Sequence, residues 1–474
     1  MASRRDQLHS YQFMVQRLAS AVIYRETDPE RVPFRRSGGT LFIGVMLAVL
    51  ALGAAGIYGV LAPGGNTSWR TDKAIIVEKE TGARYVYLDG TLHPVLNYAS
   101  ARLILKQNEV PTLLVSAASL RGVPRGAVLG IAGAPDSLPP RTQLVTGAWV
   151  LCSRPDADDA GRATARSVLF IGGRHEGGRV LDDSVGLLVQ HPDGSVYLVW
   201  HSTRYAVREP QLVLTALALG QAPVVPAAPA WINALPAGPD LKRISIAKRG
   251  AAGPLPNSRV GQVVLAQSQT GEAQYYAVLD DGVADITQVQ ADILLNDPDT
   301  AVAYPGAQPQ AVRRTDLATA KKSAQTLLPR PGSLQPPART PAIVAAAGAQ
   351  TGICATFTNV ATPPQVSVGV PLPQIERGAA AGQAGPGAVV ADQVVVSPGG
   401  GVVVEAAQAP EATGGAVSIV TDLGVRHPLA SPAVLGYLGY DGATVVRMPA
   451  GLVALVPAGR ALDPAAAGLP VTGS

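Results

Sequence analysis

The sequence predicts an α+β fold, mostly β, in which a chain of small β-rich units follows a single membrane-spanning helix. Two observations lead to this prediction. The chain of 474 residues holds 51 Gly and 40 Pro but only 15% charged residues, a composition that favours many short strands joined by tight turns. One stretch of 22 residues, 40–61, carries no charge at all. A chain of this length is also expected to hold more than one domain, at roughly 100–200 residues each.

The first 39 residues form a basic arm in which we expect one amphipathic helix. Its apolar residues follow a 3-4-3-4 spacing that lines one face of a helix, and Asp28-Pro29 ends the pattern. They are Leu8, Tyr11, Val15, Leu18 and Val22. Two interpretations remain open: the helix lies on the inner leaflet of a membrane with the help of its arginines, or it docks onto a helix or domain of a partner.

Residues 40–61, "TLFIGVMLAVLALGAAGIYGVL", are expected to cross a membrane. As a helix they would be about 33 Å long, enough for a hydrocarbon core of about 30 Å. A cleaved signal peptide is disfavoured because the apolar run is too long and follows a long leader. Arg31, Arg35 and Arg36 crowd the N-terminal flank, so the positive-inside rule places residues 1–39 in the cytoplasm and 62–474 outside it.

The chain has two cysteines, Cys152 and Cys354, and both lie in the outer segment. In an oxidising compartment two distant cysteines most simply form one disulfide. Neither has a CxxC partner or a neighbouring His, which disfavours a catalytic thiol or a metal pair. A bridge would join the strand-like segments 143–153 and 351–360 and close a loop of about 200 residues. If it acts by lowering the entropy of the unfolded chain, it would stabilise the fold by about 5 kcal/mol.

Four stretches of the outer segment resemble one another, which predicts internal repeats. Each has alternating apolar residues around a turn, as expected of a β-hairpin, and we expect a short helix in each unit, such as 98–105. The stretches are "AIIVEKETGARYVYLDGTLHPV" from Ala74, "GLLVQHPDGSVYLVWHSTRYAV" from Gly186, "QVVLAQSQTGEAQYYAVLDDGVADIT" at 262–287 and "GGAVSIVTDLGVRHPLAS" at 414–431.

Asp89 and His93 lie close enough in sequence to be an acid–base pair or part of a metal site. The internal copies favour a structural interpretation instead. The His93 position aligns with Tyr205, Asp285 and His427, and the Asp89 position with His201, Asp281 and Asp422. Asp-Gly at 89–90 and at 281–282 is typical of a type I′ turn, which needs φ > 0 at both residues. We therefore expect a hairpin turn and a strand exit, and assign no catalytic, cofactor-binding or metal-binding residue.

The order of these features predicts the domain organisation. Units two and three should form one end, units one and four the end near the membrane, and the cysteine-bearing segments the middle. The expected boundaries are a cytoplasmic arm at 1–39, the span at 40–61, repeat 1 at 62–141, the first part of a central domain at 142–180, repeat 2 at 181–248, repeat 3 at 249–310, a Pro-rich connector with the second part of the central domain at 311–392, and repeat 4 at 393–474.

Common site motifs are missing from the sequence. There is no GxxxxGK[ST], GxSxG, HExxH or EF-hand pattern. The net charge of +4 comes mostly from the basic arm, so no basic patch for nucleic acid is expected. The loop "GGRHEGGR" at 172–179 resembles an anion-binding loop, although Gly-Arg loops are common on surfaces.

Paired acids and tryptophans receive structural interpretations as well. Asp182-Asp183 and Asp280-Asp281 fall where turns are expected, although paired carboxylates also bind cations. Trp149, Trp200 and Trp231 are expected in the core rather than as ligand platforms.

The full set of features resembles the EccB family, a membrane core component of the ESX (type VII) secretion system of mycobacteria and related actinobacteria. The resemblance rests on "SYQFMVQRLASAVIYRETDPERVPFRR", "VYLDGTLHPVLNYASARLIL" and "RGVPRGAVLGIAGAPDSL", together with one span, four repeats and two cysteines. It implies an inner-membrane complex with EccC, EccD, EccE and other EccB copies that exports small helical proteins. It also implies an elongated outer part of four repeats, similar to a phage-lysin cell-wall-binding fold, around a disulfide-bridged centre.

Three functions follow as hypotheses. The first is a structural core subunit in the inner (plasma) membrane, with no cofactor, whose outer part self-associates and contacts the cell wall. The second is an extracytoplasmic ATPase using ATP with Mg, because family members are often named ATPases; its site would lie around Arg174, His175 and Arg179. The third is a membrane-anchored peptidoglycan-binding protein. The missing nucleotide motifs favour the first, without an enzymatic activity.

Overall fold

The computed structural model of the chain describes most of its residues. The described residues are 4–25, 34–61, 67–157, 160–173, 177–267, 272–330, 332–346, 348, 351–372 and 389–471. The chain divides into two compact units: unit 1 comprises residues 1–70, 78–82 and 114–123, and unit 2 comprises the rest. At a coarse level the mixture of helices and sheets agrees with the predicted fold class.

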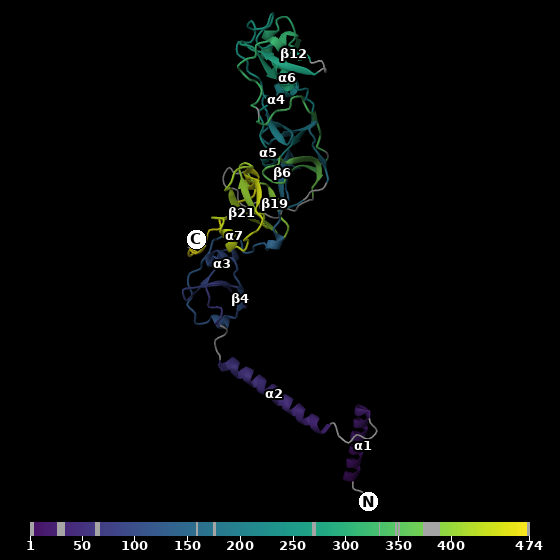
Figure 1. The fold of residues 1–474 in the computed structure, drawn as a ribbon, viewed down its shortest axis with the longest axis vertical. Helices are drawn as coiled ribbons and strands as arrows, with labels where there is room; N and C mark the ends of the chain where they lie inside the picture. Colours follow the sequence, from purple (N-terminus) through teal and green to yellow (C-terminus); the bar gives the residue numbers. More distant parts are fainter. Residues whose placement is uncertain are drawn as a thin grey trace. The chain divides into compact units, whose positions relative to one another are not determined.

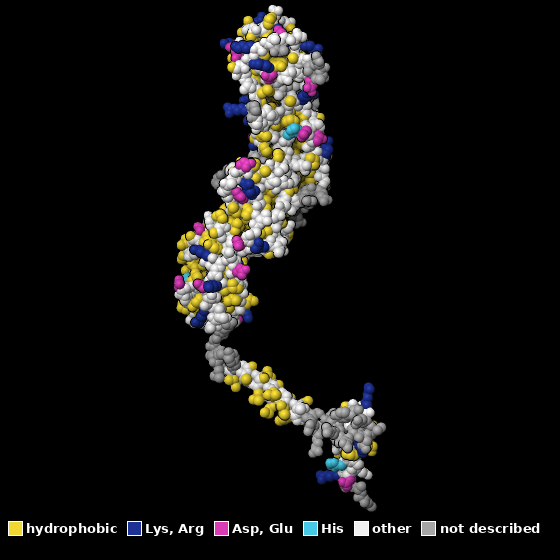
Figure 2. Space-filling view, viewed as in Figure 1, with side chains coloured by type: hydrophobic (Ala, Val, Ile, Leu, Met, Phe, Trp, Pro, Cys, Tyr) yellow, Lys and Arg dark blue, Asp and Glu magenta, His cyan; other side chains and the backbone are white. Residues whose placement is uncertain are grey.

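Unit 1 contains the two N-terminal helices, α1 (Arg4–Tyr24) and α2 (Phe34–Leu61). In the described part of the chain, α2 is the one helix long and apolar enough to cross a membrane, over Gly39–Ile57, and none of this stretch is buried. Apolar side chains cover its surface in Figure 2. Of the arginines expected to set the topology, Arg31 lies outside the described residues, whereas Arg35 and Arg36 belong to the first turns of α2.

Four small β-sheets share one strand order, in which the first strand lies between the second and the fourth. Their strands are drawn as arrows in Figure 1. Sheet I contains β1 (Ile75–Glu78), β2 (Arg84–Leu88), β3 (Thr91–Pro94) and β4 (Thr112–Val115). Sheet II contains β8 (Val185–Gln190), β9 (Val196–Trp200), β10 (Thr203–Val207) and β11 (Val224–Pro226), and β16 (Ala342–Ile343) also pairs with β8. Sheet III contains β12 (Val263–Gln267), β13 (Ala273–Val278), β14 (Val283–Ile286) and β15 (Val312–Arg313). Sheet IV contains β20 (Gly401–Ala407), β21 (Ala416–Thr421), β22 (Arg426–Pro428) and β23 (Val446–Pro449).

The crossover from the third to the fourth strand carries a helix in every small sheet. In sheets II, III and IV the fourth strand runs parallel to the first, and such a parallel neighbour needs a crossover connection. The crossover helices are α3 (Tyr98–Leu105), α4 (Pro210–Ala216), α6 (Gln288–Asn296) and α7 (Val434–Tyr437). The helix predicted at 98–105 is confirmed. Its N-cap is Asn97, whose side chain accepts a hydrogen bond from the Ser100 N–H.

The turn chemistry predicted for the hairpins holds in sheet I and fails in sheet III. Leu88 pairs with Thr91 across a two-residue loop, in which Asp89 and Gly90 have φ of 46° and 79°, as a type I′ turn requires. In sheet III, Val278 pairs with Val283 across a four-residue loop, and neither residue of the pair 281–282 has a positive φ. The prediction of a type I′ turn there is wrong: the Leu279 N–H donates to the Gly282 carbonyl oxygen, so Asp280 and Asp281, not Asp281 and Gly282, lie between the bonded residues.

A six-stranded sheet, here called the central sheet, contains both cysteines. Its order is β19-β6-β5-β17-β18-β7. The strands are β5 (Trp149–Ala157), β6 (Ala163–Ile171), β7 (Arg179–Val180), β17 (Thr351–Phe357), β18 (Gln365–Pro371) and β19 (Gln393–Val395). Cys152 lies directly opposite Cys354 on the adjacent antiparallel strands β5 and β17, and the two form a disulfide with an S–S distance of 2.07 Å. The predicted bridge is confirmed.

Buried clusters of apolar side chains extend across neighbouring sheets of unit 2. The largest joins the central sheet to sheets II and IV through α5 (Pro229–Ala234) and α8 (Ala450–Ala454), with Trp149 and Trp231 fully buried in it. A second joins α3 of sheet I to sheet IV, and a third joins sheet II to α6 of sheet III.

None of the described clusters draws a residue from α1 or α2. The segment from residue 67 onward therefore keeps every described core when the two helices are removed, so we expect it to fold on its own.

Candidate functional site

Asp89 and His93 do not form an acid–base pair in the structure. Asp89 occupies the first position of the tight turn, whereas His93 lies two residues into β3 and pairs with Val86. The His93 ring instead contacts the Ala127 carbonyl oxygen, with Nδ1 at 3.1 Å. Asp89 therefore lies in the predicted turn, and His93 lies in the strand that follows it.

The aligned ring positions cover a glycine in three of the four small sheets. A Cβ added to Gly126 would lie 2.2 Å from His93 Cε1, one on Gly238 would lie 2.3 Å from Tyr205 Cε1, and one on Gly459 would lie 2.5 Å from His427 Cε1. Each glycine ends a Pro-x-Gly segment that runs alongside the third strand. A Cβ at any of these three positions would collide with the ring, so the close packing requires a glycine there.

Sheet III has a different pair at this position. Its strand residue Val283 bonds to the backbone of residues 321 and 323, as Arg204 does to 236 and 238 in sheet II. The position next to Val283 is Ala284, and Ser323 occupies the place of the glycine. The alignment of Asp285 with His93 is therefore wrong by one residue, and Ala284 takes the position of His93. In sheet III the strand therefore has a small residue, Ala284, where the other sheets have a ring, and the neighbouring segment has Ser323 where they have a glycine.

The paired carboxylates are held by groups of the protein itself. Asp280 accepts from Lys248 Nζ at 2.8 Å, and this bond lowers the pKa of its carboxyl. Asp281 accepts from the Ser323 hydroxyl at 2.6 Å, which lowers its pKa as well. Asp182 accepts from Ser184 with the same effect on its pKa, and Asp183 lies 3.0 Å from His201 Nε2. In the described part no cluster of His, Cys, Asp and Glu suits a metal ion.

The remaining sequence candidates are mostly structural or lie outside the described residues. Arg174, His175 and Glu176 belong to the latter, and Arg179 lies exposed on β7. Trp149 and Trp231 are buried core residues as predicted. Trp200 is only half-buried and stacks on His201 with ring centroids 3.6 Å apart, so the prediction of a core position is wrong for it.

An ionic network ties sheet II to sheet III. Asp297, whose side chain is fully buried, accepts from Arg243 at 2.8 Å and from Arg249 at 2.7 Å. Arg243 lies on the linker between the two sheets and also bonds Glu209 and Asp299. A buried carboxylate needs such paired, hydrogen-bonded partners to remain charged. No local sequence pattern reveals this network, because its acids lie 34 to 56 residues from Arg243.

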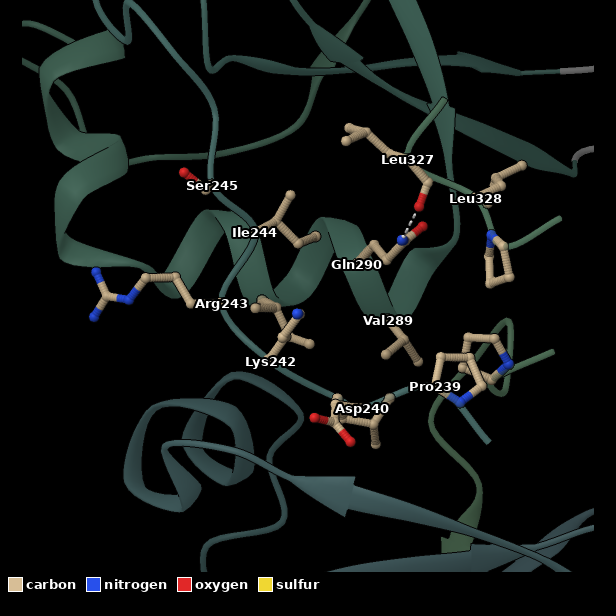
Figure 3. Close-up of a pocket in the computed structure, with 14 residues that line it drawn as sticks. Pro239, Asp240, Lys242, Arg243, Ile244, Ser245, Val289, Gln290, Leu327 and Leu328 are labelled. Atoms are coloured by element: carbon tan, nitrogen blue, oxygen red, sulfur yellow. Dashed lines mark hydrogen bonds between the residues drawn. The ribbon is translucent and has the colours of Figure 1, made fainter. Parts of the chain in front are cut away.

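A pocket of ≈ 530 Å³ lies beside this network, between the linker, α6 and residues 327–329 of the Pro-rich connector. Figure 3 shows the linker from Asp240 to Ser245 passing α6, with Leu327 and Leu328 across from it. Gln290 on α6 donates to the Leu327 carbonyl oxygen at 2.7 Å and fixes the far wall. Sequence analysis missed this pocket, whose lining comes from three separate segments.

The Pro-rich connector is a strap along sheets II and III. Tyr205 donates its hydroxyl to the Gln335 carbonyl oxygen, and the Val289 N–H donates to the Ala338 carbonyl oxygen. The connector then pairs with β8 through β16.

Comparison with known proteins places the chain in a family. Residues 1–472 match the family described as "Type VII secretion system ESX-1, transport TM domain B", T7SS_ESX1_EccB. The chain belongs to the EccB family. The match covers α1, α2 and all five sheets of the described residues, so the predicted resemblance is confirmed.

Curated EccB relatives resemble the chain over nearly its whole length. The "ESX-2 secretion system ATPase EccB2" of Mycobacterium tuberculosis is 32% identical over 97% of this chain and 93% of that protein. The "ESX-3 secretion system ATPase EccB3" of Mycolicibacterium smegmatis is 30% identical over 89% of this chain and 82% of that protein. Both names include the word ATPase.

Solved EccB structures share the fold. A structure described as an EccB3 dimer from the ESX-3 core complex covers 84% of this chain and all of that one, with 30% identity and a TM-score of 0.61. A chain of an intact ESX-5 inner membrane complex covers 100% of this chain and 96% of that one, with 24% identity and a TM-score of 0.62. The second likeness shows the fold alone.

The close approach of Gly238 to the Tyr205 ring predicts a strong effect of one methyl group. Gly238→Ala should lower the free energy of unfolding of fragment 67–474 by about 1–3 kcal/mol, because Tyr205 is buried and cannot move away. Urea denaturation measures this. Gly220→Ala is the matched control, since nothing lies within 4 Å of its new Cβ. Equal stability of the two variants would show that the ring packing is looser than described.

Burial of His427 predicts a pH dependence of stability. Burial lowers the pKa of its imidazole, and the contact with the Arg460 carbonyl oxygen opposes this only in part. The imidazole has a pKa of about 6.5 in the unfolded chain, so the unfolded chain binds the proton more readily than the folded one does. The free energy of unfolding therefore decreases as the pH is lowered below about 6.5. His427→Phe keeps a ring against Gly459 but has no group that titrates there. When the pH is lowered from about 7.5 to about 5, the free energy of unfolding should decrease less for this variant than for the wild-type fragment. The urea midpoint at each pH measures this. Identical losses would contradict the prediction.

Proposed function

We propose that the chain is a structural core subunit of an ESX (type VII) secretion membrane complex. The observation that carries this proposal is the family match over residues 1–472, supported by relatives that align over almost their whole length. Export of small helical proteins across the inner membrane is the function that such a complex supports. Contact of the outer part with the cell wall stays a prediction.

The anchor in this proposal is the apolar helix α2, with the N-terminus in the cytoplasm. Its exposed apolar surface, with no part of Gly39–Ile57 buried, supports a single pass through the inner membrane. Arg31, Arg35 and Arg36 set this orientation through the positive-inside rule. Residues 62–474 would then lie outside the cytoplasm, where the disulfide is stable.

The outer part, in this proposal, consists of four copies of one unit around the central sheet. The shared strand order of sheets I to IV supports this, as do the crossover helix of each sheet and the Pro-x-Gly segment of sheets I, II and IV. The central sheet combines strands from before and after sheets II and III, which supports a single domain assembled from two parts of the chain.

The partners in this proposal are EccC, EccD, EccE and further copies of the chain. The EccB3 relative described as a dimer supports self-association. The apolar face of α1 supports docking in the cytoplasm: its five apolar side chains are 48% to 73% exposed. An amphipathic helix with such a face fits a groove on a partner.

Charges on that face should disrupt assembly. Val15→Asp/Leu18→Asp should reduce co-purification with the other membrane components at least about tenfold, because docking would bury two carboxylates without partners. Affinity purification of the detergent-solubilised complex measures this. His9→Asp/Gln16→Asp adds two carboxylates elsewhere on α1 and should leave the yield unchanged. If the first variant co-purifies as well as wild type does, α1 has no docking role.

We also propose that the subunit hydrolyses no nucleotide, although relatives carry the name ATPase. The sequence has no GxxxxGK[ST] motif to cradle a triphosphate. Fragment 65–474 and its Arg174→Ala/His175→Ala variant should therefore show the same background in an ATP hydrolysis assay with Mg. Activity that disappears in the variant would support the extracytoplasmic ATPase hypothesis instead.

A further inference from the structure

The pocket between sheets II and III has the size and lining of a small-molecule site. Its volume of ≈ 530 Å³ falls within the range of about 300–1,000 Å³ that is usual for such sites, which are mainly apolar with a few polar groups. Leu241 and Ile244 come from the linker, Val289 and Ile293 from α6, and Leu327 from the connector. Three segments therefore supply a continuous apolar wall.

The pocket is held in shape by polar contacts outside this wall. Arg243 anchors the linker to Asp297 and Asp299 at the end of α6. Gln290 forms a capping box with Thr287 at the start of α6 and donates its amide to the Leu327 carbonyl oxygen. A pocket held in this way before a ligand arrives loses little affinity to ordering.

Among the charged residues that line the pocket, one cation is left without an ionic partner in the described chain. Asp240 is paired with Arg208 at 2.8 Å. Arg243 is shared among three carboxylates. Lys242 is exposed between these two residues, and its ammonium makes no ion pair with any described residue. A free ammonium at the edge of an apolar hollow favours a ligand with an anionic head.

We propose that this pocket binds a small amphiphile with an apolar body and one carboxylate. The body would lie against Ile244, Val289 and Leu327, and the carboxylate would face Lys242 (Figure 3). A single exposed cation and apolar walls suit a monocarboxylate better than a phosphorylated ligand, which would call for an arginine fork or several donors.

Dodecanoate is a suitable probe, and dodecyltrimethylammonium is its counterpart with the same chain and the opposite charge. Isothermal titration calorimetry with fragment 67–474, below the micellar range of both, should give one dodecanoate per chain, with a dissociation constant on the order of 100 µM. The cation should bind at least about tenfold more weakly. Saturable binding of both probes with equal affinity would overturn the carboxylate preference, and binding of neither would overturn the site.

Variants separate the head-group contact from the apolar pocket. Lys242→Glu should weaken dodecanoate binding about tenfold or more, whereas Lys242→Arg should keep it within about threefold. Ile244→Trp fills the pocket from the half-buried linker and should abolish binding without lowering the melting temperature. Lys106→Glu, which reverses an exposed charge at the C-terminal end of α3, should bind as the wild-type fragment does. If Lys242→Glu and Ile244→Trp also bind as wild type does, dodecanoate lies elsewhere and the proposal fails.

Discussion

Each small sheet must share its hydrophobic core with a neighbour, and the architecture of unit 2 depends on this constraint. A few short strands and one short helix bury too little apolar surface to be stable alone. The described clusters accordingly extend from sheet to sheet: sheet I with sheet IV, sheet II with sheet III, and the central sheet with sheets II and IV. Loss of one sheet would expose part of the core of the next.

Sharing a core places polar groups where two sheets meet, and these groups fix the geometry there. Between sheets II and III, the buried carboxylate of Asp297 forms ion pairs with Arg243 and Arg249, which both come from the linker. Removing one partner of such a buried network leaves the other charge without compensation, which is costly. The pocket lies beside this network, and Arg243 belongs to both.

Local patterns in the sequence predicted features that depend on neighbouring residues. Asp89-Gly90 formed the expected turn, residues 98–105 the expected helix, and the only two cysteines the expected bridge. Two of the failures have a common cause in sheet III. The alignment there was one residue off, which took Asp281-Gly282 out of the turn positions and Asp285 out of the ring position. The pairing of a ring with a distant glycine was accessible in principle, because Pro-x-Gly recurs at 124–126, 236–238 and 457–459. The Arg243–Asp297 network and the pocket could not be predicted from local patterns, since they form only when distant segments of the chain come together.

The disulfide gives the chain a second covalent route. Cys152 and Cys354 are 202 residues apart in sequence but lie on adjacent strands. Sheets II and III and the connector therefore form a closed covalent ring. Tension between the N-terminal helices and sheet IV would pass through the sulfur bridge and leave this ring unloaded. A protease that cuts once inside the ring would release no fragment, and the two ends of the chain would stay joined until the bridge is reduced.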